Sequence, residues 1–436
     1  MFVFTRDENS GIINAKGGEK MEKIWTDIAI IGGGASGLAA ALEAAMTNSS
    51  LKIAIVERLD RVGKKILTTG NGRCNLSNKN LDEKYYHGTI DAMKVIRKTT
   101  SAEDFFKLLG VVCTTDEQGR MYPRSNSAAT ILGALRLKAR ELGIIELCGQ
   151  NVVSIKKSVK GYILATDTTE ILSKRVIIAS GGYAAPSSGT DGSMMRILKE
   201  MGYQVSKICP AVAPLRVKPE FLKGMKGVRA KGKIQAVSGG KVLYEEIGEI
   251  QFTENSLSGI CVFNLAYLMS EYEGKLTLRI DLLPEMSENE LADYLFMVKN
   301  QRSCFEISEL LTGIFARNPA QYLIKRILNR QQSDAISTLK NGELRKLAKE
   351  IKSLEFEVSG TSPWQNAQAT SGGINVNCVN ENLESKLHEG IYFAGEILDV
   401  DGECGGYNLQ WAWSSGIWSG KNCAESLKAG KNNGKN

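Results

Sequence analysis

The chain has 436 residues, 43% of them hydrophobic and 24% charged, which is enough for two or three domains of an ordinary globular protein. Two histidines and nine cysteines without a C-x-x-C pair exclude a His-rich metal centre, a zinc ribbon and a thioredoxin-like motif, and are typical of a reduced cytoplasmic protein. The net charge of +7 is too diffuse to indicate nucleic-acid binding by itself, and the longest uncharged apolar run, 28–42, is too short to span a membrane.

Residues 1–22 are predicted to be a disordered tail, because residues 1–20 show no hydrophobic periodicity, and residues 429–436 are predicted to be a second tail. A further hypothesis concerns the start of translation. Purine-rich codons resembling a ribosome-binding site can encode residues 16–20, so the native start is predicted at Met21.

A nucleotide-binding pattern opens the ordered chain. A strand, the G-x-G-x-x-G turn Gly32–Gly37, a small-residue helix and a second strand follow one another over residues 24–56, and Glu57 ends the second strand. The first glycine permits a tight turn, the second lets a pyrophosphate approach the backbone, and the third allows close helix–strand packing. Glu57 can accept a hydrogen bond from a ribose hydroxyl. The pattern predicts a Rossmann-like dinucleotide-binding fold.

The loop over residues 57–78 is basic, glycine-broken and rich in Asn. Lys64, Lys65 and Arg73 offer cations, and the glycines allow a ligand to approach the backbone. Such a loop could hold a second phosphate or the edge of a flavin. The alternative is a solvated basic loop.

The middle of the chain changes character near residue 210. Before it we expect helices at 102–109 and 128–142, a strand pair at 151–155 and 162–166, and a buried strand at 176–179. After it we expect an inserted antiparallel sheet or barrel, made of the short strands 233–237, 241–245, 249–253 and 276–281. Ser287 and Glu290 form a capping box that opens a helical part extending to about residue 354.

A basic cluster lies within this insertion, and its members are Lys223, Lys226, Arg229, Lys231 and Lys233. The default interpretation is a solvated face. The sharper alternative is docking of NAD(P)H phosphates or an anionic substrate.

The last part of the chain supplies a second glycine-rich turn and a helix. A strand at 391–394 enters Gly395 and Glu396, and a helix begins near Asn408 after the glycines of 402–406. Leu409, Trp413 and Ile417 give that helix an apolar face, while Ala412, Gly416 and Gly420 give it a small face for tight packing. Its N-terminus could favour the negative charge of a reduced flavin. The alternative is a core helix.

Six segments resemble a known flavoprotein oxidoreductase family, whose members are described as NAD(P)/FAD-dependent oxidoreductases and include 3-dehydro-bile-acid Δ4,6-reductases and aminoacetone oxidases. The segments are IIGGGASGLAAA, GKKILTTGNGRCNLSN, IIASGGYAAPSSGTDG, GEIQFTENSLSG, ATSGGINV and YFAGEILDVDGECGGYNLQWAWSSG. Many relatives have His where Glu254 stands and Pro where Cys261 stands, which puts a His-dependent role of that segment in doubt.

The resemblance implies an α/β fold, with a split Rossmann-like FAD-binding domain, an inserted antiparallel barrel-like domain and a small helical part. The implied boundaries are 23–205 and 355–428 for the FAD domain, 206–285 for the β-rich insertion and 286–354 for the helical part. The residues implied to line FAD are Gly32, Gly34, Ala35, Ser36, Gly37, Glu57, Arg58, Lys64, Lys65, Arg73, Cys74, Asn75, Val153, Ala179, Gly181, Gly182, Gly395, Glu396, Asn408 and Leu409.

The leading functional hypothesis is an FAD-dependent reductase of a C=C bond conjugated to a ketone in a hydrophobic, steroid-like or bile-acid-like small molecule. Because histidines are scarce, Tyr183 and Tyr407 are candidate proton donors, although packed structural tyrosines are the alternative. With no second G-x-G-x-x-G, NAD(P)H is expected to bind only transiently. The alternatives are an amine oxidase acting on an aminoacetone-like substrate with O2, and an FAD-stabilised nucleic-acid-binding protein. No partner protein is evident.

Overall fold

The computed structural model describes residues 22–272 and 274–429, and the chain divides into two compact units. Unit 1 comprises Met1–Ile208 and Ser371–Asn436, and unit 2 comprises Cys209–Thr370. The predicted tails and the proposed start at Met21 lie outside the described residues, apart from Glu22 and Ala429, which belong to the first strand and the last helix. No helix in the described ranges is long and apolar enough to cross a membrane.

A seven-stranded sheet forms the centre of unit 1, with the order β7-β2-β1-β10-β9-β8 and with β19 also paired to β10. Neighbours among β7, β2, β1, β10 and β19 run parallel, whereas β8 and β9 form an antiparallel extension. The strands are β1 (Glu22–Ile31), β2 (Ile53–Glu57), β7 (Ile145–Cys148), β8 (Ser154–Ser158), β9 (Gly161–Ala165), β10 (Thr169–Ile178) and β19 (Ile391–Phe393).

Strand β10 joins the two sequence-distant parts of unit 1. One edge of β10 pairs with β1 along its length. The other edge pairs with β9 over residues 170–173 and with β19 over residues 176–178. The chain therefore returns to the sheet more than two hundred residues later, beside the strand that leads into Gly181–Gly182.

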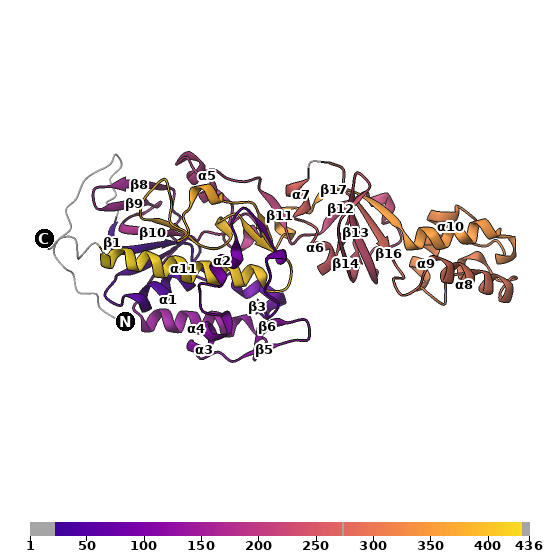
Figure 1. The fold of residues 1–436 in the computed structure, drawn as a ribbon, viewed down its shortest axis with the longest axis horizontal. Coiled ribbons are helices and arrows are strands. Elements are labelled where there is room, and N and C mark those ends of the chain that lie inside the picture. The colour runs from indigo at the N-terminus through magenta and orange to yellow at the C-terminus, as the bar shows by residue number, and fades with distance from the viewer. Residues whose placement is uncertain (1–21, 273, 430–436) are drawn as a thin grey trace. The chain divides into compact units, whose positions relative to one another are not determined.

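Two helices pack tightly beside this sheet, α1 (Ala35–Thr47) and α11 (Tyr407–Ala429), and they lie side by side in Figure 1. A Cβ atom built on Gly416 would lie 2.4 Å from the Ser36 carbonyl oxygen, and one on Gly420 would lie 2.3 Å from the Ala40 carbonyl oxygen. The small face predicted for the last helix is therefore confirmed, since the backbones approach too closely for any larger residue.

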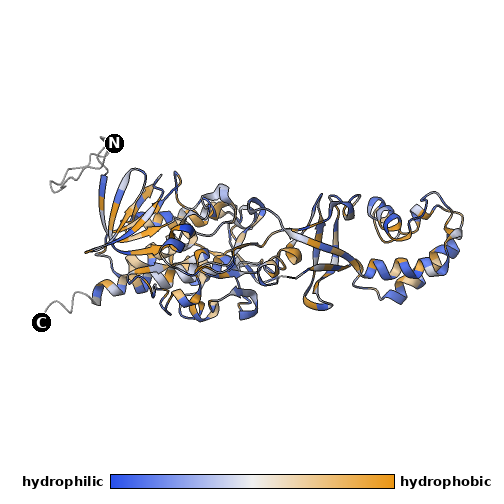
Figure 2. Cartoon of the chain, turned by 90° about the horizontal axis from the view of Figure 1, so that it is seen from above, coloured by the Kyte–Doolittle hydropathy of each residue, from blue (hydrophilic) through white to orange (hydrophobic). Residues whose placement is uncertain are grey.

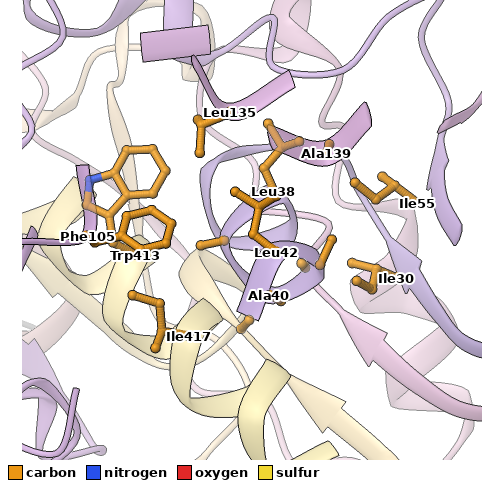
Figure 3. Packing of buried hydrophobic residues seen from close by; sticks show 14 of the residues in the cluster. Ile30, Leu38, Ala40, Leu42, Ile55, Phe105, Leu135, Ala139, Trp413 and Ile417 are labelled. Atoms are coloured by element: carbon orange, nitrogen blue, oxygen red, sulfur yellow. The ribbon is translucent and has the colours of Figure 1, made fainter. Parts of the chain in front are cut away.

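The adjacent apolar face of α11 enters the hydrophobic core. Trp413 is fully buried and Ile417 is 4% exposed, and both pack in one cluster with Leu38, Leu42 and Ile30. Figure 3 shows these side chains from β1, α1 and α11 converging. The predicted apolar face of the last helix is confirmed.

Unit 1 contains four further α-helices and two small sheets among the described residues. The helices are α2 (Ala92–Ile96), α3 (Ala102–Leu108), α4 (Ala128–Glu141) and α5 (Ser193–Glu200). The strands are β3 (Ser77–Asn78), β5 (Cys113–Thr115) and β6 (Arg120–Pro123) in one sheet, and β4 (Tyr86–Gly88) with β20 (Val400–Gly402) in another.

Unit 2 contains a closed barrel with the strand order β12-β15-β14-β13-β16-β17, as the inserted domain was predicted to have. The strands are β12 (Leu215–Val217), β13 (Arg229–Ser238), β14 (Lys241–Phe252), β15 (Ser256–Ser258), β16 (Thr277–Asp281) and β17 (Leu354–Thr361). The predicted strands at 241–245 and 249–253 are one continuous strand, β14. Other short elements are α6 (Ile260–Phe263), α7 (Leu268–Glu271) and the strand pair β11 (Cys209–Ala211) and β18 (Ala369–Ser371).

The helical part of unit 2 consists of α8 (Glu288–Gln301), α9 (Arg317–Leu328) and α10 (Asn341–Lys352). Helix α8 begins with the predicted capping box, in which Ser287 Oγ accepts from the Glu290 N–H and the Glu290 carboxylate accepts from the Ser287 N–H. Hydrophobic and hydrophilic residues alternate around these helices in Figure 2, as expected for helices that bury one face.

The predicted return to the first domain at residue 355 is wrong. Strand β17 pairs with β16 and β12 and completes the barrel, and unit 1 resumes only at Ser371. The buried residues Leu354 and Phe356 alternate with the exposed Glu355. This alternation is typical of an antiparallel barrel strand rather than of a parallel strand covered on both faces.

Candidate functional site

The glycine-rich turn after β1 combines closely packed glycines, among them Gly32 and Gly37, with one, Gly34, that faces open space. Gly32 has a φ of +102°, and a Cβ there would lie 2.5 Å from the Ala179 carbonyl oxygen. A Cβ on Gly37 would lie 1.9 Å from the Gly32 carbonyl oxygen. By contrast, apart from its chain neighbours, no described atom lies within 4 Å of a Cβ built on Gly34. Two glycines are therefore required by the fold, and Gly34 leaves room for a ligand.

Glu57, at the end of β2, supports this turn. Its carboxylate accepts hydrogen bonds from the Gly33 N–H at 2.8 Å and from the Leu59 N–H at 2.9 Å, and the residue is only 8% exposed. A carboxylate offers about four acceptor positions, so the two bonds leave capacity for a ligand hydroxyl. Glu57 also lines the pocket described next.

We expect Glu57→Gln to lower the stability of the protein by about 1–3 kcal/mol, because the Gly33 and Leu59 N–H groups bond to different oxygens, and the amide NH2 that replaces one oxygen cannot accept from the N–H that this oxygen served. The measurement is urea unfolding of the ligand-free protein, with the exposed residue Glu117→Gln as the control. Equal unfolding midpoints for both variants would contradict a structural role for the carboxylate.

An open pocket lies at the carboxyl ends of β1, β2 and β10. In open α/β sheets this edge is where ligands bind. The Ser180 hydroxyl is buried and has no hydrogen-bond partner among the described residues. The pocket is lined by residues 31–32, 56–58, 150–152, 180–182 and 189–195.

The structure brings five predicted residues into this pocket, namely Gly32, Glu57, Arg58, Gly181 and Gly182. Val153 is not among the pocket residues. Its side chain is 48% exposed and its N–H bonds to the Ala165 carbonyl, while the preceding residue, Val152, lines the pocket. Residues 150–152 and 189–195 were missed, although the Gly189 and Gly192 of the latter segment were a signal for unusual backbone there.

A second group of predicted residues meets where the loop after β2 contacts the segment after β19. Lys65 Nζ lies 2.7 Å from the Glu396 carboxylate, and the other oxygen of Glu396 is buried without a partner among the described residues. Asn75 Oδ1 is likewise buried and unpartnered, and a Cβ on Gly406 would lie 2.8 Å from it. Gly395, with a φ of +78°, packs against Ser36. Residues more than 300 positions apart therefore share one site.

The unpartnered atoms indicate what this site can hold. Leaving a buried acceptor or hydroxyl unsatisfied costs about 1–3 kcal/mol. Asn75 Oδ1 and Glu396 Oε1 can only accept in their usual states, and the Ser180 hydroxyl can donate or accept. A ligand that carries several hydroxyl groups and acceptor oxygens would satisfy them.

Several other predicted residues have side chains engaged elsewhere. The Arg73 guanidinium lies 4.7 Å from the Tyr122 ring centroid. Asn408 holds the Gly402 backbone, donating to its carbonyl at 2.6 Å and accepting from its N–H at 2.9 Å, and Leu409 packs against the core. Lys64 is half-buried in the loop after β2, and Ala35, the first residue of α1, is half-buried against the core.

The Cys74 thiol lies in the core rather than at the loop surface, and a place for Cys74 beside FAD stays a prediction. Cys74 is fully buried in the hydrophobic cluster that contains α1, and burial raises the pKa of its thiol to about 12. A small apolar side chain at this position packs more favourably in the core than against a polar ligand.

The two candidate proton donors are both packed against other parts of unit 1. The Tyr407 ring stacks on Tyr85 at 4.6 Å, its hydroxyl donates to the Asn80 carbonyl at 3.3 Å, and burial raises its pKa. The Tyr183 ring fills the space beside Gly192, where a Cβ would lie 2.1 Å from its Cε1 atom. Each tyrosine therefore has a packing role, and a proton-donor role for either stays a prediction.

Comparison with known proteins adds to this geometry. The HI0933-like protein Rossmann domain matches residues 26–422. The 3-dehydro-bile acid delta(4,6)-reductase of Clostridium scindens is 38% identical over 406 residues, which cover 91% of this chain and 99% of that protein. The ribosomal RNA dihydrouridine synthase of Haemophilus influenzae is 26% identical and covers 90% of this chain and 96% of its own. The Escherichia coli enzyme of the same name is 27% identical, covering 93% and 98%.

Proposed function

Because the chain belongs to the HI0933-like family of flavoprotein oxidoreductases, we propose that it is an FAD-dependent reductase of a C=C bond conjugated to a ketone in a hydrophobic, bile-acid-like or steroid-like substrate. The observation that carries this proposal is the 38% identity to a bile acid delta(4,6)-reductase over 99% of that protein. An identity of this extent supports the same reaction class.

The residues of unit 1 fit FAD. The open space at Gly34 would let a pyrophosphate approach the backbone, and the pocket beside Glu57 lies where the adenosine of a dinucleotide would bind. Asn75 and Glu396 can accept hydrogen bonds from the hydroxyl groups of the ribityl chain, and the N-terminus of α11 can stabilise negative charge on the ring. When bound, FAD supplies hydride transfer, which protein side chains cannot perform.

The chain's own residues would hold and orient the cofactor. Lys65, neutralised in part by Glu396, places a cation beside the site without leaving an isolated buried charge. We propose NAD(P)H as the electron donor, binding transiently, because the sequence contains a single G-x-G-x-x-G. We also propose a cytoplasmic location, which the absence of disulfides among the nine cysteines of the described residues supports.

A second candidate substrate is a uridine in RNA. Two ribosomal RNA dihydrouridine synthases match at least 90% of this chain, and a dihydrouridine also arises by reduction of a C=C bond conjugated to a carbonyl. This candidate ranks second because most cations of the predicted basic cluster are already paired. Three of its five cations are paired with carboxylates, in the pairs Lys226–Glu254, Arg229–Glu249 and Lys233–Glu245. Paired charges attract phosphates weakly.

Anaerobic stopped-flow spectroscopy tests the proposal. We expect NADH or NADPH to bleach the flavin absorbance of the purified protein, and an enone steroid or bile acid to restore it faster than a uridine-containing ribosomal RNA fragment does. If neither nucleotide bleaches the flavin, the reductase proposal is wrong. Faster reoxidation by the RNA fragment would instead favour the second candidate.

A further inference from the structure

A glycine-rich segment, residues 186–193, borders the pocket that Glu57 lines. We call this segment the strap. It follows β10 and ends at Ser193, the first residue of α5, and its residues 189–193 line the pocket together with the end of β2. Gly189 and Gly192 have φ values of +108° and +73°, a region that favours glycine. The strap therefore follows a path that few other sequences would adopt.

Two contacts join the strap to the opposite wall of the pocket, the end of β2. The first is an ion pair between Arg58 Nη1 and Asp191 Oδ1 at 2.7 Å. The second is close packing of Gly189 on Leu59, whose Cδ1 atom would lie 2.6 Å from a Cβ at Gly189. Both contacts involve residues directly after Glu57, so the strap is joined to the wall that carries the pocket's carboxylate.

Two further contacts tie the strap to the segment that precedes it. The Thr190 hydroxyl donates to the Gly182 carbonyl, and the Tyr183 ring packs against Gly192. These anchors are local to the segment, within ten residues. Contact with β2 depends on Arg58, Asp191 and the Leu59–Gly189 packing.

The ion pair persists over the whole physiological pH range. Partial burial disfavours the charge of Asp191, but hydrogen bonds from Arg58 and Ser193 outweigh burial and lower the pKa of the carboxyl to about 2. The Arg58 and Asp191 side chains are 34% and 48% exposed, so the interaction is sensitive to salt.

We propose that Asp191 is a positioning residue whose ion pair with Arg58 clasps the two walls of the pocket together and slows the dissociation of the bound dinucleotide. This inference depends on the proposed function, because the dinucleotide is the FAD proposed there. Neutralising the pair would let the strap move away from β2 more often, and the cofactor would leave through the gap.

The test measures the rate at which FAD leaves Asp191→Asn. Asparagine keeps an oxygen that can accept from the Ser193 N–H, so the substitution removes the charge and little else. The control is Glu83→Gln, which breaks an exposed ion pair with Arg97 elsewhere in unit 1. The holoprotein is diluted at low salt, and the increase in fluorescence of released FAD gives the dissociation rate.

We expect FAD to dissociate roughly two- to fivefold faster from Asp191→Asn than from the wild type, as for loss of a partly exposed ion pair, with no change for Glu83→Gln. The thermal midpoint of the FAD-free protein should be unchanged, which separates clasping from a general loss of stability. High salt should accelerate release from the wild type more than from the variant, because only the wild type has a pair to screen.

Two failures can be distinguished. If the wild type takes up FAD but Asp191→Asn releases it at the wild-type rate, the clasp is wrong and the proposed function stands. If the wild type takes up no FAD, the proposed function itself is wrong, and the clasp with it.

Discussion

Replacing Gly37 with alanine should destabilise the protein by about 3 kcal/mol or more, whereas the same change at Gly34 should leave the fold intact and weaken FAD binding. A Cβ at Gly37 would lie 1.9 Å from the Gly32 carbonyl oxygen, so α1 must shift away from the turn that it follows. A Cβ at Gly34 meets no described atom within 4 Å beyond its neighbours, and its φ of −79° suits alanine. Only a ligand would be displaced.

Two measurements separate these effects. Thermal unfolding of the FAD-free proteins should show a lower midpoint for Gly37→Ala and a wild-type midpoint for Gly34→Ala. Fluorescence titration with FAD should show weaker binding for Gly34→Ala. Wild-type affinity in that variant would mean that no pyrophosphate approaches the turn, and would remove the main geometric support for FAD.

Trp413→Ala should have the largest effect on stability, about 3–5 kcal/mol, because it opens a cavity in the centre of unit 1. Trp413 is fully buried, meets Phe106 edge-on at 5.0 Å and donates from Nε1 to the Leu76 carbonyl at 3.1 Å. Leu76 directly follows Asn75, so the same change should loosen the loop that presents Asn75 and weaken FAD binding.

Urea unfolding of the FAD-free protein measures this effect, with Trp25→Ala as the control. Trp25 is 54% exposed, and its loss should change the free energy of unfolding by no more than about 0.5 kcal/mol. A similar small change for Trp413→Ala would contradict the packing shown in Figure 3.

Much of unit 1 could be predicted because its local patterns and its tertiary packing agree. The strand, glycine turn, helix and acidic residue around Gly32–Glu57 carry distinct periodicities, and the structure has them within about two residues of their predicted positions. The family was also predicted correctly from motifs spread along the chain. The small and apolar faces of α11 followed from the spacing of Gly416 and Trp413.

The features that could not be predicted depend on which distant segments of the chain meet in the folded protein. Apolar and polar residues alternate over 354–361, which predicts a strand but does not say which sheet that strand joins. In the structure it pairs with β16 in the barrel. A cysteine in a polar loop gives no sign that its thiol turns inward, as that of Cys74 does. The pairing of Arg58 with Asp191, 133 positions away, has no local signature either.

Strand β10 pairs with β19, which comes from a distant part of the chain, and this pairing has a consequence for folding during synthesis. Strand β19 and helix α11 come from the second part of unit 1, which resumes at Ser371, so α1 and the sheet cannot be covered until that part has been synthesised. At about 5–20 residues per second, roughly ten to forty seconds separate the first part of unit 1 from its closure. During that interval the nascent chain exposes the small-residue surface of α1, and chaperones have both the time and the surface to bind it.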